Sequence, residues 1–157
     1  MKKVIILSGI SGSGKSTYGR KLLEGALWTS VCSADDYFMV GSEYRFDASK
    51  LSLAHGQCFK KFIDLLKGGD QVVVVDNTNT SVVEIAPYVL GGQAWDYEVE
   101  IHTIREPEGE VSPAVYADRC WSRNQHGVSL PTVERQLDAL LSRQLPPWWV
   151  EKLVRES

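Results

Sequence analysis

A glycine-rich segment near the start of the chain, GISGSGKST at residues 9–17, has the residue types and spacing of a phosphate-binding loop. It fits the pattern G-x-x-x-x-G-K-[ST], directly after an apolar run and directly before a helical pattern. Small residues let consecutive backbone N–H groups converge on an anion, and the following helix presents its positive end to it. We therefore expect a P-loop that binds a nucleoside triphosphate through Gly9, Ser11, Gly12, Ser13, Gly14, Lys15, Ser16 and Thr17.

Lys15, Ser16 and Asp76 have the side chains that a bound triphosphate and its metal would need. The motif predicts that Lys15 reaches the β- and γ-phosphates and that the Ser16 hydroxyl ligates Mg²⁺. Asp76 ends the apolar run QVVVVD, where a carboxylate is able to hold magnesium through water. The alternative is that Asp76 caps the next helix. Asn79, three residues later, is a second candidate for orienting an acceptor.

Two adjacent carboxylates, Asp35 and Asp36 in CSADDYF, follow a second predicted strand. Transfer of a phosphoryl group to an alcohol needs a carboxylate that orients the hydroxyl and accepts its proton. Adjacent residues of a strand point to opposite sides, so we expect only one to serve, and we favour Asp35 as the base. The alternative is that both aspartates simply form a turn.

Arg119 and Arg123 lie four residues apart on one face of a predicted helix, before the polar break at residues 124–129. We expect two helices over about residues 112–142 to form a lid that brings these cations to the phosphates. Such a lid would also exclude water, which competes with the acceptor alcohol. The alternative is a solvated charged helix followed by an ordinary loop.

Four aromatic residues follow Asp35 closely: Tyr37, Phe38, Tyr44 and Phe46. They are able to stack on the bases of an acceptor. They are equally suited to pack a small surface subdomain.

Alternating strand and helix patterns must position these residues. The predicted strands are Lys3–Ser8, about Thr29–Ser33, Gln71–Asp76 and Tyr97–Ile104. The predicted helices are Lys15–Leu27, Ala48–Lys67, Ser81–Leu90, Ser112–Asn124 and Pro131–Ser142, with a short helix after Pro147. The pattern predicts one α/β domain over residues 1–157, with three layers and a mainly four-stranded parallel sheet. The alternating run YEVEIHTI is expected to be an edge strand.

The composition is that of an ordinary globular protein: 157 residues, 43% hydrophobic, with a formal net charge of −3. That charge does not favour a protein that binds nucleic acid by coating it with lysines. Cys32, Cys58 and Cys120 form no CxxC pair and are expected to be buried thiols in a reducing compartment, the cytoplasm. No apolar run approaches the roughly 18 residues of a membrane span.

Four segments follow one another along the chain: GISGSGKST, SADDYF, DNTN followed by VVEIAPYV, and RNQHGVSLP. In this order they make the chain resemble the small P-loop kinases of the polynucleotide 5′-hydroxyl kinase type, which include phage enzymes and related animal domains. The resemblance runs from Lys2 to about Leu141. It implies a four-stranded parallel sheet, ATP and Mg²⁺, and transfer of the γ-phosphate to a 5′-hydroxyl of DNA or RNA. It implies that Lys15 and Ser16 bind phosphates and metal, that Asp35 is the general base, that Arg123 is a lid arginine and that Asp76 is the acid after the third strand.

Two positions depart from the phage pattern. Phe38 stands where phage-type enzymes carry an arginine that helps hold the acceptor's phosphate, and His126 replaces a second lid arginine, as in the animal domains. Two alternatives therefore stay beside the polynucleotide kinase. The chain could phosphorylate a small alcohol, a nucleoside or a modified-base hydroxyl, or it could be a regulatory module that binds ATP without catalysis.

Overall fold

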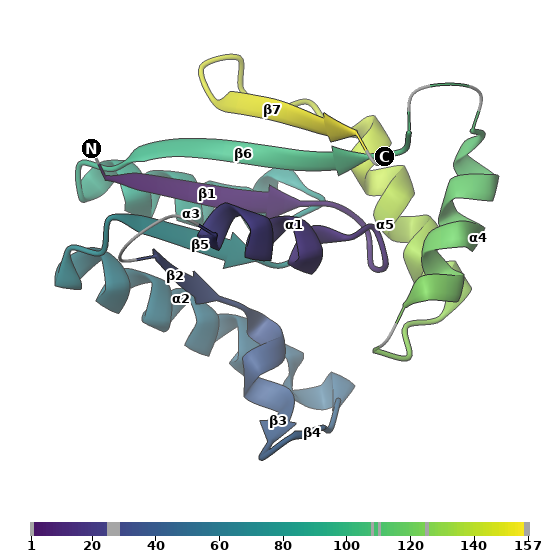
Figure 1. Cartoon of the computed structure of the whole chain (residues 1–157), viewed down its shortest axis with the longest axis horizontal. Helices are drawn as coiled ribbons and strands as arrows, with labels where there is room; N and C mark the ends of the chain where they lie inside the picture. Colours follow the sequence, from purple (N-terminus) through teal and green to yellow (C-terminus); the bar gives the residue numbers. More distant parts are fainter. Residues whose placement is uncertain (1, 25–28, 108, 110, 125, 156–157) are drawn as a thin grey trace.

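The computed structural model describes residues 2–24, 29–107, 109, 111–124 and 126–155. Within these residues a five-stranded parallel sheet forms the centre of the molecule (Figure 1). Its spatial order is β2-β5-β1-β6-β7. The strands are β1 (Lys3–Ser8), β2 (Thr29–Cys32), β5 (Val72–Asp76), β6 (Glu98–Arg105) and β7 (Val150–Arg155).

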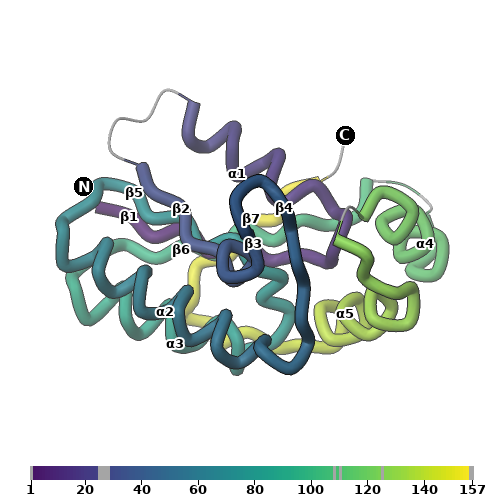
Figure 2. The backbone as a smooth tube through the Cα atoms, turned by 90° about the horizontal axis from the view of Figure 1, so that it is seen from below, coloured from purple at the N-terminus to yellow at the C-terminus, as the bar shows by residue number. Residues whose placement is uncertain are grey.

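Helices cover both faces of the sheet, which gives the three layers expected from the sequence (Figure 2). Helix α1 (Lys15–Leu23) lies on one face, and α2 (Leu51–Gly68) and α3 (Val82–Ala94) lie on the other. Helices α4 (Pro113–Arg123) and α5 (Leu130–Ser142) lie beside the carboxyl ends of the strands (Figure 1). Within the described parts of the chain, none of the helices has both the length and the apolar character to cross a membrane.

Strands β1 and β5 are apolar along their middle because both of their faces are covered. Val4 and Ile6 of β1 pack in the core beneath α2 and α3, whereas Ile5 and Leu7 pack beneath α1. The same alternation holds along β5. Both strands end at the same edge of the sheet, where the phosphate-binding segment and Asp76 follow.

A short segment after β2 links the sheet to α2. The 3₁₀ turn Ala34–Phe38 begins at Ser33, whose hydroxyl accepts a hydrogen bond from the Asp35 N–H at 3.2 Å. A small hairpin follows, formed by β3 (Met39–Val40) and β4 (Glu43–Tyr44). A second 3₁₀ turn, Ala48–Lys50, then leads into α2. This hairpin projects beyond the sheet at the edge where the polar segments gather (Figure 1).

The structure corrects the sequence interpretation at the C-terminal part. Residues after Pro147 form strand β7 rather than a short helix, and β7 pairs in parallel with β6. The sheet therefore has five strands rather than four, and β6 is not an edge strand. The alternation of β6 has another cause, since Glu100 and His102 form a polar network on the side of the sheet that carries α1. Helix α1 ends at Leu23, and residues 25–27 of its predicted extent lie outside the described residues.

The centre of this network is Glu100. Its carboxylate accepts contacts from Lys3 at 3.0 Å, His102 at 2.9 Å and Lys152 at 3.3 Å. Burial raises the pKa of Glu100, but the three partners outweigh burial and bring the pKa down to about 2. His102 in turn lies 2.6 Å from the Tyr18 hydroxyl, so the network ties β1, β6, β7 and α1 together.

Replacing Glu100 is expected to destabilise the fold in a pH-dependent way. The carboxyl has a pKa of about 2 in the folded chain and an ordinary value of 4.5, so its stabilisation is complete above about pH 4.5 and disappears as the pH falls toward 2. Glu100→Gln should therefore lower the free energy of unfolding by roughly 2–3 kcal/mol at pH 7 and by much less at pH 3. Urea denaturation at both pH values measures this, with Glu98→Gln on the same strand as the control. An equal loss at both pH values would contradict the assignment.

Candidate active site

A pocket of about 360 Å³ opens at the carboxyl edge of the sheet, between the loop after β1, the turn after β2, the end of β5 and the end of α4. The residues that the sequence singled out and that line it are Ser11, Gly12, Gly14, Lys15, Ser16, Thr17, Asp35, Asp76, Arg123 and His126. Three polar segments far apart in the sequence thus meet at one site, as expected for a parallel α/β sheet.

The loop between β1 and α1 has the backbone of an anion-binding nest. Gly12 and Gly14 take φ values of 80° and 93°, which residues with a side chain rarely adopt. A Cβ on Gly12 would lie 1.9 Å from the carbonyl oxygen of Cys120 on α4, so the loop packs directly on that helix. Ile10 anchors the same loop, since it is fully buried in a cluster with α4 and α5. Gly9 does not line the pocket, because its N–H bonds the carbonyl of Thr78 at 2.9 Å.

Lys15 is nearly buried at the start of α1, and its Nζ donates to the carbonyl of Ile10 at 2.9 Å. Burial lowers the pKa of Lys15, although the carboxylates of Asp76 and Asp35 oppose the shift. The ammonium group therefore has little water around it, and among the described residues its hydrogen-bond partner is a backbone oxygen. Phosphate oxygens of a ligand would supply negatively charged hydrogen-bond acceptors to the Lys15 ammonium group.

Ser13 lies below the pocket rather than in its lining. Its hydroxyl is buried and has no hydrogen-bond partner among the described residues. A buried polar atom without a partner costs about 1–3 kcal/mol, which a ligand in the loop would recover. The loop therefore fits a phosphate group.

Ser16 and Asp76 bring two hard oxygen ligands together. The Ser16 hydroxyl donates to the Asp76 carboxylate at 3.0 Å. Burial raises the pKa of Asp76, with Lys15 and Ser16 acting against it. Mg²⁺ is typically held by one or two protein oxygens together with phosphates and water, so this pair fits a magnesium site that is completed by a nucleotide. Within the described part of the chain, no cluster of three or more acidic, His or Cys side chains forms an all-protein metal site.

The two aspartates after β2 face different ways. Asp35 lines the pocket, whereas Asp36 lies 3.7 Å from Lys61 on α2. Both carboxylate oxygens of Asp35 already have partners, since the Tyr44 hydroxyl donates to Oδ1 at 3.0 Å and Nδ1 of His126 lies 3.2 Å from Oδ2. The rings of Tyr44 and His126 also stack, with their centroids 4.5 Å apart. Each oxygen still has a free lone pair, so Asp35 is able to accept a hydrogen bond from an incoming hydroxyl while these partners hold its carboxylate in place.

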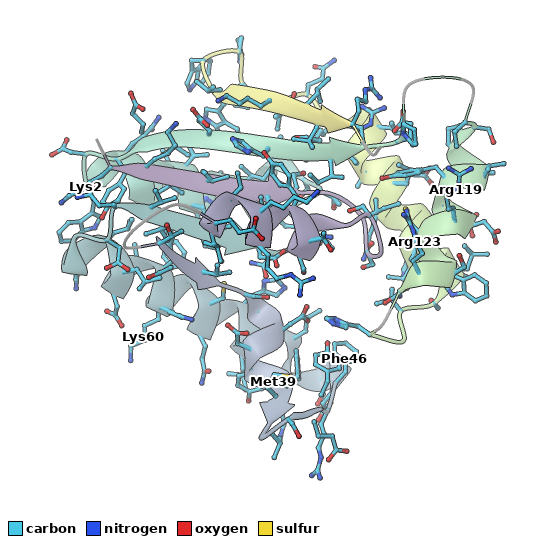
Figure 3. All side chains as sticks on the ribbon, in the orientation of Figure 1. Lys2, Met39, Phe46, Lys60, Arg119 and Arg123 are labelled. Atoms are coloured by element: carbon cyan, nitrogen blue, oxygen red, sulfur yellow. The ribbon has the colours of Figure 1, made fainter. Side chains whose placement is uncertain are left out.

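The two arginines of α4 occupy different places. Arg123, at the end of the helix, lines the pocket, but Arg119, one turn earlier, does not (Figure 3). The helix pair is not loosely attached, because α4, α5 and Ile10 share a buried cluster. Gln136 of α5 adds a further link by accepting the N–H of Ser11 at 2.9 Å.

Four further residues line the pocket although the sequence analysis assigned them no individual role: Arg20, Asn77, Thr78 and Asn124. Arg20 had a detectable signal, because it lies one helical turn after Ser16. Asn77 lies in the DNTN segment, but its role depends on a distant part of the chain, since its carboxamide oxygen accepts the N–H of Ala34 and so fixes the turn that carries Asp35.

Asn79 and Arg143 do not line the pocket but hold together the strands that end at it. Asn79 is buried and donates to the carbonyl of Leu7 at 2.9 Å, so it is not in a position to orient an acceptor. Arg143 donates to the hydroxyl of Ser8 at 2.7 Å, to the carbonyl of Asn79 at 2.9 Å and to Glu151 at 3.1 Å. One guanidinium thereby joins the ends of β1, β5 and β7.

Comparison with known proteins places this site in a family. The family model described as AAA domain (AAA_33) matches residues 4–147. The chain belongs to this family. It is also 33% identical over 137 residues to human NEDD4-binding protein 2, a match that covers 86% of this chain. The chain spans only 7% of the length of that relative.

Solved structures with a similar fold include kinases and a chain of an RNA repair complex. A chain of the Pnkp1/Rnl/Hen1 RNA repair complex matches 89% of this chain and 44% of its own length, with a TM-score of 0.67 and 19% identity. A gluconokinase from Sinorhizobium meliloti matches 98% of this chain and 82% of its own length, with a TM-score of 0.62 and 17% identity. An APS kinase from Mycobacterium tuberculosis, in complex with AMPPNP and APS, has a TM-score of 0.56 and 17% identity, over 99% of this chain and 90% of its own length. The α/β P-loop kinase fold expected from the sequence is confirmed.

The close packing of Gly12 on α4 can be tested with a matched pair of glycines. Gly41 also has a positive φ, 64°, but a Cβ there would meet nothing within 4 Å. Gly41→Ala should cost about 1 kcal/mol of stability from backbone strain alone. Gly12→Ala adds the collision with Cys120 and should cost at least about 3 kcal/mol and weaken nucleotide binding. Denaturation and calorimetric titration with ATP measure both effects, and equal behaviour of the two variants would contradict the packing argument.

Proposed function

We propose that this domain is an ATP-dependent phosphotransferase that moves the γ-phosphate of ATP to a 5′-hydroxyl of DNA or RNA. The observation that carries the proposal is the meeting of Lys15, Asp35, Asp76 and Arg123 at one pocket. A P-loop on its own is equally suited to hydrolysis or switching, but a carboxylate across the pocket from the phosphate loop suits transfer to an alcohol.

In this proposal each side chain has one task. Lys15 and the loop N–H groups hold the β- and γ-phosphates, and Arg123 offsets the charge that develops on the transferring group. Asp35 accepts the proton of the acceptor hydroxyl. At the same time the hydroxyl oxygen of the acceptor bonds to the γ-phosphorus, and the bond between the γ-phosphorus and the oxygen that leaves with ADP breaks. Ser16 and Asp76 would hold Mg²⁺, which neutralises phosphate charge when it is bound.

The fold-level relatives leave the acceptor open, since they include an RNA repair complex, a gluconokinase and an APS kinase. The polynucleotide acceptor is supported by the order of the four motifs along the chain. Phe38 supports a second candidate, a small alcohol or nucleoside acceptor. It is buried, with 3% of its surface exposed, so it offers no cation to an acceptor phosphate.

The two neighbouring aspartates provide a matched test of the base. Asp35→Asn keeps the shape of the side chain but removes its ability to take a proton, so we expect transfer to fall by at least about 100-fold. Binding of ATP should change little, because the P-loop is intact. Asp36→Asn is the control, since Asp36 faces Lys61 outside the pocket and should keep near-normal activity. Transfer from γ-labelled ATP to a 5′-hydroxyl oligonucleotide measures both variants; near-normal turnover of Asp35→Asn would refute the assignment.

A further inference from the structure

An aromatic surface leads away from the proposed base along the projecting hairpin. The rings of Tyr44 and Phe46 lie nearly parallel, with an angle of 13° between their planes and 6.5 Å between their centroids. The Phe38 ring packs against both, with its centroid 5.0 Å from that of Phe46 and 6.1 Å from that of Tyr44. Figure 3 shows Phe46 and Met39 in this segment, away from the central sheet.

The rings of Phe38 and Phe46 differ in how much of their surface is exposed to solvent. Phe38 is buried and holds the hairpin to the core. Phe46, in contrast, keeps 52% of its surface exposed, and its neighbours Met39 and Val40 are 44% and 54% exposed. The hairpin therefore presents an apolar surface to solvent beside a polar pocket, which is typical of a binding surface.

Tyr44 connects this surface to the chemistry, because its hydroxyl donates to Asp35 at 3.0 Å while its ring lies beside Phe46. A molecule that stacks on Phe46 would thus lie on the side of the platform from which Tyr44 leads to the carboxylate. The net charge of −3 also leaves little general attraction for phosphates, so the acceptor needs another source of affinity.

We propose that Phe46 and Tyr44, the aromatic platform, bind the nucleobase of the acceptor's terminal nucleotide, with the base stacked on the exposed ring of Phe46 because the Tyr44 ring already stacks on His126. The proposal rests on the proposed function and adds that the acceptor must carry a base beside the hydroxyl that receives the phosphate. Stacking on aromatic side chains tolerates every base, so the platform selects for a nucleotide terminus rather than for a sequence. A polyol acceptor has no flat face to stack and would gain nothing from these rings.

The test compares two single-stranded 5′-hydroxyl oligonucleotides that differ only at the first position. One carries a normal first nucleotide, and the other a tetrahydrofuran abasic residue, which keeps the 5′-hydroxyl. Phe46→Ala should raise KM for the base-bearing strand by about 5- to 150-fold, leave kcat nearly unchanged, and leave KM for the abasic strand unchanged. Phe46→Trp should restore the affinity. Trp95→Ala is the control, since Trp95 is 43% exposed at the end of α3, where β6 begins, and should change neither value.

The outcomes separate this proposal from the proposed function. Phosphorylation of both strands with equal KM, unchanged by Phe46→Ala, would overturn the platform and leave the kinase activity standing. If neither strand is phosphorylated, the proposed function fails, and fluorescence anisotropy with 3′-labelled strands decides the platform. Tighter binding of the base-bearing strand that is lost in Phe46→Ala then supports it, and equal binding of both strands overturns it.

Discussion

The backbone of the phosphate-binding loop touches the backbone of α4, with the Cα of Gly12 so close to the Cys120 carbonyl that no side chain fits between them. This contact, together with the burial of Ile10 between α4 and α5, fixes the loop relative to the helix pair. The positive φ angles of Gly12 and Gly14 are tolerated because these positions are glycine, and they aim the loop N–H groups at one point. The position of Arg123 over the same pocket follows from the same packing, because it ends the helix on which the loop rests.

This arrangement changes how the expected lid is understood. Helices α4 and α5 are joined to the loop through a buried cluster and through Gln136, so the helix pair is packed onto the phosphate-binding loop rather than held apart from it. His126, in the connection between the two helices, contacts Asp35 and stacks on Tyr44. Asp35 therefore contacts both the segment that follows α4, through His126, and the hairpin, through Tyr44.

The parts of the site that depend on local sequence were predictable. The P-loop pattern requires particular residues at fixed spacing, and Asp35 comes shortly after β2 while Asp76 ends β5, both at the ligand-binding edge of the sheet. Strand β7 was not predicted, because its residues are mostly exposed and its pairing with β6 joins segments nearly fifty residues apart. The roles of Asn79 and Arg143 depend on backbone carbonyls of distant segments, which leave no pattern in a sequence. Arg119 and Arg123 share a helix face, and only the packing of α4 on the loop separates them.

The measurement that tests the central claim most directly is transfer of label from γ-labelled ATP, with Mg²⁺, to matched oligonucleotides that end in either a 5′-hydroxyl or a 5′-phosphate, with mononucleosides in parallel. The account predicts label on the 5′-hydroxyl strands and none on the 5′-phosphate strands, because a 5′-phosphate leaves no free 5′-hydroxyl for Asp35 to activate. Label on the mononucleosides but not on the strands, or on no acceptor while ATP still binds, would contradict the assignment of a polynucleotide 5′-hydroxyl kinase.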